Sequence, residues 1–99
     1  MTRRHPSIDP VHPGEILRED VFPALAITKP ALAEALGISR QTLHELFTLK
    51  RGVTPEMALR LEAVLGTSAE TWLALQAERD LWSARRSGKV KGLKRLQAA

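Results

Sequence analysis

The stretch LAEALGISRQTLHELF carries the side chains with the most specific potential chemistry in this sequence. Its candidate base-contacting residues are Arg40, Gln41, Thr42, His44 and Glu45. Arginine can bond bidentately to guanine and glutamine to adenine, while threonine offers a hydroxyl and a methyl group to a base edge. On one face of a helix, these residue types suit reading base edges in the DNA major groove. His44 and Glu45 are equally consistent with plain solvated positions.

Two short helices meeting at Gly37 would hold that polar row in place. Ala33 is small enough to lie where the helices cross, and Gly37 accepts the positive φ that the turn needs. Leu43 and Leu46 are three residues apart and anchor the second helix by one face. The spacing predicts a helix-turn-helix. Other packed amphipathic helix pairs share such spacing. The DNA interpretation therefore depends on the polar face and on the lysine and arginine residues that flank it.

Four residues around this pair are candidates for holding DNA phosphates: Lys29, Ser39, Lys50 and Arg51. Ser39 and the neighbouring N–H groups at a helix start can hold a phosphate, helped by the helix dipole. Such contacts position a protein on DNA without reading its sequence. The charge distribution agrees, because residues 28–54 carry a net +2 and residues 83–99 a net +6 within a chain of net +4.

The remaining sequence predicts helices throughout and no strand. A first helix starts at Pro13, and Pro23 limits or bends its end. Thr28, Ser39 and Thr54 are expected N-caps, and Gly66 ends the fourth helix. Thr67, with Glu70 three residues later, has capping-box spacing for the fifth helix. We therefore expect an all-α, five-helix domain over residues 13–84, an N-terminal arm over 1–12, and a flexible, disordered basic tail over 85–99.

Composition narrows the classes of function. The 99 residues include no cysteine, so disulfides, thiolate nucleophiles and Cys-ligated metals are excluded. The three histidines His5, His12 and His44 lack metal-ligand spacing, and no Gly-rich phosphate loop appears. We therefore expect no enzyme activity, cofactor or metal. No apolar run approaches a membrane span and no signal peptide is evident, which favours a cytosolic protein.

The quoted stretch resembles the Cro/C1-type (XRE) helix-turn-helix. The wider sequence is similar to HigA-type antitoxins of bacterial type II toxin–antitoxin modules, on the motifs HPGEIL, LAEALGIS, KRG, ALRLE and LGTSAETWLALQ. This resemblance covers about residues 12–81. One departure is Thr48-Leu49, where family members often carry Asn-Gly before KRG. The basic tail also lies outside the shared pattern.

The resemblance implies partners, and a location in the bacterial cytosol near the nucleoid, that spacing alone does not show. Such antitoxins bind and neutralise a RelE-like (HigB-type) mRNA-cleaving toxin, and repress their own operon by binding a palindromic operator as a homodimer. Carried over, Arg40, Gln41 and Thr42 fall at base-reading positions. Ser39, Lys50 and Arg51 fall at phosphate-holding positions.

The last helix, with Trp72, Leu73 and Leu75, falls where such antitoxins often dimerise. A second interpretation is that the Trp72/Trp82 face caps the core of a monomer. Two other functions stay open: a solitary XRE-family regulator without a toxin, and an interaction module that no longer binds DNA.

Overall fold

The structure is a computed structural model that describes residues 9–97, and all of its regular elements in that range are helices. The helices are α1 (Pro13–Ile16), η1 (Leu17–Val21), α2 (Phe22–Leu25), α3 (Lys29–Leu36), α4 (Arg40–Phe47), α5 (Pro55–Leu65) and α6 (Ala69–Ser87). Because α1, η1 and α2 follow without a break, residues 9–97 form five helices, as expected. Residues 1–8 of the expected arm, including Arg3 and Arg4, and the last two residues of the tail lie outside the described residues.

The first helix passes Pro23 instead of ending there. The Phe22 N–H donates to the Leu17 carbonyl five residues earlier, so η1 is a π-helical turn. Proline inside a regular α-helix collides with the carbonyl four residues earlier, and a wide turn just before it is a known way to relieve the ladder. The helix continues to Leu25 and ends at Ala26, whose φ is 56°.

Hydroxyl caps set most helix starts, and three of the four expected ones are confirmed. Thr28, Ser39 and Thr54 each accept a hydrogen bond from the backbone N–H three residues later. The expectation for the last helix was wrong by one residue, because Ser68, and not Thr67, accepts from the Thr71 N–H at 3.1 Å. Serine and threonine are both good N-caps, so two adjacent hydroxyls left the register open to sequence reading.

A single core holds the helices together. Ala33, Leu43 and Leu46 are at most 2% exposed, as the helix-turn-helix spacing predicts. Gly37 has φ 71° at the end of α3, the left-handed conformation expected for that turn. The other core residues include Leu17, Leu32, Leu36, Phe47, Val53, Met57, Ala58, Leu61, Ala69 and Trp72.

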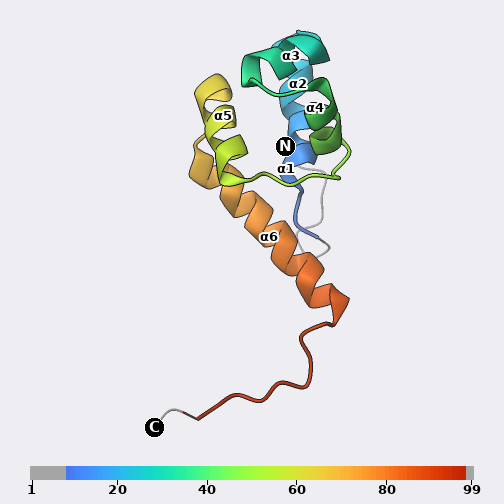
Figure 1. The fold of residues 1–99 in the computed structure, drawn as a ribbon, viewed down its shortest axis with the longest axis vertical. Helices are drawn as coiled ribbons and strands as arrows, with labels where there is room; N and C mark the ends of the chain where they lie inside the picture. The colour runs from blue at the N-terminus through green and yellow to red at the C-terminus, as the bar shows by residue number, and fades with distance from the viewer. Residues whose placement is uncertain (1–8, 98–99) are drawn as a thin grey trace.

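The C-terminal half of α6 extends away from the other helices, and residues 89–97 leave it without regular structure (Figure 1). Helix α6 runs to Ser87, three residues beyond the expected domain boundary, and Gly88 ends it with φ 70°. The helical arm therefore carries part of the segment expected as tail.

Leu49 has φ 64° in the turn after α4, a left-handed conformation at a non-glycine residue. Exchanging it for isoleucine keeps size and polarity but adds a β-branch, which this region tolerates poorly. We expect Leu49→Ile to lower the free energy of unfolding by about 1 kcal/mol, measured by urea denaturation. The control Leu59→Ile, at an exposed helical residue, should cost only a few tenths of a kcal/mol. Equal losses in the two variants would contradict the assignment of strain to Leu49.

Candidate nucleic-acid interface

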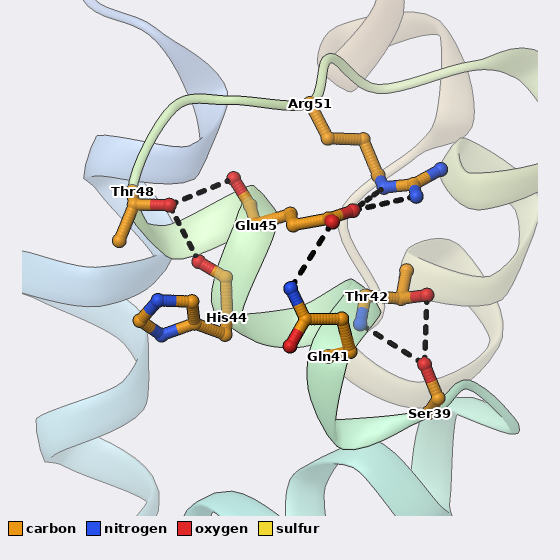
Figure 2. Close-up of polar contacts among 7 residues, drawn as sticks. All are labelled: Ser39, Gln41, Thr42, His44, Glu45, Thr48 and Arg51. Carbon is orange, nitrogen blue, oxygen red and sulfur yellow. Dashed lines mark hydrogen bonds and ion pairs between the residues drawn. The ribbon is translucent and has the colours of Figure 1, made fainter.

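Helix α4 has one buried face and one free polar face. Leu43, Leu46 and Phe47 are at most 3% exposed and hold the helix against the core. Arg40, Gln41 and His44 are exposed, while Thr42 and Glu45 are half-buried. In Figure 2, His44 points to the opposite side of the helix from Thr42, with Gln41 between them. All five predicted base-contacting residues therefore lie on one helix, spread around the side that does not face the core.

The N-terminus of α4 is tied by its own side chains. Ser39 Oγ accepts from the Thr42 N–H at 3.0 Å and donates to Thr42 Oγ1 at 2.9 Å. The Thr42 hydroxyl hydrogen remains available to a base or a phosphate. Ser39 is thus occupied as a cap, and a phosphate here would meet the backbone N–H groups of the first turn, where the helix dipole favours an anion.

Three of the predicted contact residues are joined to one another (Figure 2). Arg51 Nη2 and Nε lie 2.6 and 3.0 Å from Glu45 Oε1, and Gln41 Nε2 donates to Glu45 Oε2 at 3.1 Å. Hydrogen bonds from Arg51 and then Gln41 lower the pKa of Glu45 below its usual value. The sequence placed these residues on one surface but gave no sign that they form one unit.

The basic residues that are predicted to hold phosphates lie at the ends of the two helices. Lys29 is the exposed first residue of α3, and its Nζ lies 5.8 Å from the centre of the Phe47 ring. Lys50 and Arg51 are exposed in the loop after α4. The three basic side chains therefore lie at the start of α3 and just after the end of α4.

Two arginines that the sequence analysis did not select hold the helix ends. Arg60 on α5 donates to the carbonyls of Leu36 and Gly37, at 2.9 and 3.2 Å, and closes the end of α3. Arg18 donates to the Phe47 carbonyl at 2.7 Å and closes the end of α4. Basic groups at helix C-termini satisfy free carbonyls and complement the dipole. Both arginines look like ordinary surface charges in the sequence.

His12 starts the first helix by accepting the Gly14 N–H at its Nδ1, at 2.9 Å, and is 6% exposed. Burial, and then the nearby charge of Arg79, lower the pKa of His12 below 6.5, against the opposing charges of Asp80 and Glu15. The neutral imidazole is therefore the folded form, because a protonated ring could not accept at Nδ1. This confirms His12 as a helix-entry residue.

The low pKa of His12 predicts acid sensitivity. As pH falls below 6.5, the unfolded chain takes up a proton that the folded chain resists, so the free energy of unfolding decreases. Above 6.5, this contribution to stability is fully present. We expect urea midpoints to fall between pH 7.5 and 5.5 more in the wild type than in His12→Asn, whose side-chain oxygen keeps the cap without titrating. Parallel pH profiles for the two proteins would contradict this.

The predicted dimer residues on α6 do not share one exposure. Trp72 is 2% exposed and packs in the core of the single chain, as the monomer-core interpretation expects for this residue. Leu73 and Leu75 are half-buried. An apolar groove instead follows the outer side of α6, lined by Thr71, Ala74, Leu75, Ala77, Glu78 and Leu81. The spacing of large apolar residues along α6 does not show which side of the helix faces the core and which side faces outward.

Comparisons with known proteins agree with the helix-turn-helix described above. A helix-turn-helix family model covers residues 24–72. Antitoxin HigA-1 of Vibrio cholerae serotype O1 is 42% identical over 77 residues, spanning 77% of this chain and 71% of that protein. The chain belongs to the HigA-type antitoxin family of XRE-type helix-turn-helix proteins.

Two solved antitoxin structures show how closely the fold follows this family. Antitoxin GraA in complex with its operator has a TM-score of 0.82 at 37% identity, covering 96% of this chain and 99% of that chain. The Pseudomonas aeruginosa antitoxin HigA with the higBA promoter has a TM-score of 0.79 at 35% identity, covering 88% and 99%. Both relatives are bound to DNA. In the described part of this HigA-type protein, no helix is long and apolar enough to cross a membrane.

Proposed function

We propose that this HigA-type protein represses its own operon by binding a palindromic operator as a homodimer, and that it neutralises a RelE-like, HigB-type, mRNA-cleaving toxin in the bacterial cytosol. The observation that supports the DNA-binding part is the free polar side of α4. The helix is anchored by Leu43, Leu46 and Phe47, and exposed lysine and arginine side chains flank it. The operator and promoter complexes of GraA and HigA support the same role here. No cofactor takes part in this proposal.

The residues proposed to act on DNA fall into two groups. Arg40, Gln41, Thr42, His44 and Glu45 face the bases, and Lys29, Ser39, Lys50 and Arg51 lie nearest the phosphates. In a docked helix-turn-helix, the first residues of the second helix meet the base edges. Arg40 and Gln41 are therefore proposed to contribute most to discrimination between sequences.

The proposed homodimer uses the outer groove of α6 together with the half-buried Leu73. Leu81 is 53% exposed on a helical arm that projects from the domain (Figure 1). A two-fold operator needs a two-fold protein whose recognition helices lie about 34 Å apart. Covering Leu75 and Leu81 with the same surface of a second copy would meet that need. Sedimentation equilibrium should give a dimer for the wild type and a weaker one for Leu81→Ser.

Fluorescence anisotropy tests the DNA-binding proposal with a duplex from upstream of this gene and a scrambled duplex, each at two salt concentrations. We expect the upstream duplex to bind at least about a thousandfold more tightly. Arg40→Ala/Gln41→Ala should abolish most of that preference, while the control Arg95→Ala/Gln97→Ala, which removes the same side chains from the basic tail, should keep it. Equal, strongly salt-dependent binding to both duplexes would refute operator recognition.

Toxin neutralisation has a separate test. The neighbouring reading frame is expected to encode a RelE-like protein that co-purifies with this chain and cleaves mRNA only in its absence. If no such neighbour exists while operator binding persists, the protein is a solitary XRE-family regulator. If Arg40→Ala/Gln41→Ala leaves both operon expression and toxin control unchanged, it is an interaction module.

A further inference from the structure

The contact between Gln41 and Glu45 fixes which way the Gln41 amide faces. An ionised carboxylate can only accept hydrogen bonds, so the Gln41 atom 3.1 Å from Glu45 Oε2 is the nitrogen. The two residues are four apart on α4, which places their side chains next to each other on one helix face. One Nε2 hydrogen is thereby used. Oε1 and the second Nε2 hydrogen remain for a partner outside the protein.

Glu45 is itself held from the other side. Two nitrogens of Arg51 bond to its Oε1, at 2.6 and 3.0 Å, and this leaves Oε2 to Gln41 (Figure 2). Like any ordinary glutamate, Glu45 is charged at neutral pH, and the hydrogen bonds from Arg51 and Gln41 lower its pKa further. The chain of contacts from Arg51 through Glu45 to Gln41, here called the Gln41 clamp, joins the loop after α4 to the exposed side of the recognition helix.

We propose that Glu45 is a positioning residue that orients the Gln41 amide to read adenine. A clamped Gln41 presents one acceptor and one donor. Adenine offers the matching pair in the major groove, the N6 amino donor and the N7 acceptor, whereas guanine offers two acceptors, O6 and N7. Without the clamp, Gln41 could turn its amino group to guanine as readily. This inference rests on the proposed function, because it assumes that α4 docks in the major groove.

The clamp also changes what the two charged residues contribute. Glu45, expected from sequence to contact a base, would act through Gln41 instead. Arg51, expected to hold a phosphate, spends two of its nitrogens on Glu45 and keeps only Nη1 and one Nη2 hydrogen for DNA. The preference for adenine would therefore depend on a residue that lies outside α4.

The test measures the ratio of affinities for matched duplexes. Selection from random duplexes with the wild-type protein gives the preferred half-site. We expect each half-site to contain one adenine whose replacement lowers the affinity of the wild type but not that of Gln41→Ala. Changing that adenine to guanine should weaken wild-type binding about tenfold or more. Glu45→Ala should reduce the effect to about twofold, and Arg51→Met should reduce it in the same direction. The control Glu34→Ala, an equal charge change on exposed α3, should keep the wild-type ratio.

Because each ratio compares two duplexes with one protein, a partly unfolded variant does not distort it. Gln41→Ala and Gln41→Ala/Glu45→Ala should show the same adenine-to-guanine ratio, since Glu45 acts only through Gln41. The proposal is overturned if Glu45→Ala keeps the full adenine preference, or if the double variant discriminates less than Gln41→Ala. A wild-type protein with no sequence preference at all would instead refute operator recognition.

Discussion

Gly14→Ala is expected to leave little folded protein. A Cβ on Gly14 would lie deep inside van der Waals contact with the Leu46 carbonyl oxygen, 3.1 Å from the Leu46 carbonyl carbon and 3.2 Å from His12 Nδ1. The carbonyl belongs to the backbone of α4 and cannot rotate away. Relief requires the first helix to move off α4, and we expect the free energy of unfolding to fall by about 3 kcal/mol or more.

Urea denaturation followed by circular dichroism checks this expectation, with Gly52→Ala as the matched control. At Gly52 the added Cβ would meet the side-chain amide of Gln76, at 3.0–3.1 Å, which has to move by only a few tenths of an ångström and can keep its hydrogen bonds to Val53 and Asp80. We expect that control to lose about 1 kcal/mol. If Gly14→Ala is no less stable than Gly52→Ala, the close approach of the first helix to α4 is wrong.

The helix-turn-helix could be predicted from sequence because each of its demands falls on a single residue type. A small Ala33, a positive-φ Gly37 and a leucine pair three residues apart are local requirements, and each is readable within a few positions. The caps Thr28, Ser39 and Thr54 were readable for the same reason. The family resemblance then extended this local prediction to about residues 12–81.

Long-range polar contacts could not be predicted in the same way. Arg60 bonds to carbonyls 23 and 24 residues away, and Arg18 to one 29 residues away. Nothing about an arginine on a helix face says which distant backbone group it will reach. The surroundings of Trp72 were open for a related reason, because an apolar residue on an end helix can face either the core or a partner. The Gln41 clamp could not be predicted either, because it depends on where the loop after α4 places Arg51.

Gln76 makes a further long-range contact, and it is nearly buried at 8% exposure. Its Oε1 accepts the Val53 N–H at 2.8 Å, and its Nε2 donates to Asp80 at 3.0 Å. Val53 is itself 4% exposed, so its N–H has no route to water once Gln76 is replaced. A glutamine in the middle of α6 thus ties that helix to the loop carrying Lys50 and Arg51.

We expect Gln76→Leu to lower the free energy of unfolding by about 2 kcal/mol, because leucine has a similar side-chain size but leaves the Val53 N–H without a hydrogen-bond partner. The control Asp80→Ala removes only the exposed partner of Gln76 and should cost less than about 0.5 kcal/mol. Amide hydrogen exchange should quicken at Val53 more than at Leu61, in the centre of α5, since the loop loosens before the core opens. Uniform exchange across both sites, or unchanged stability, would show that the Gln76 contact does not hold the DNA-facing loop to α6.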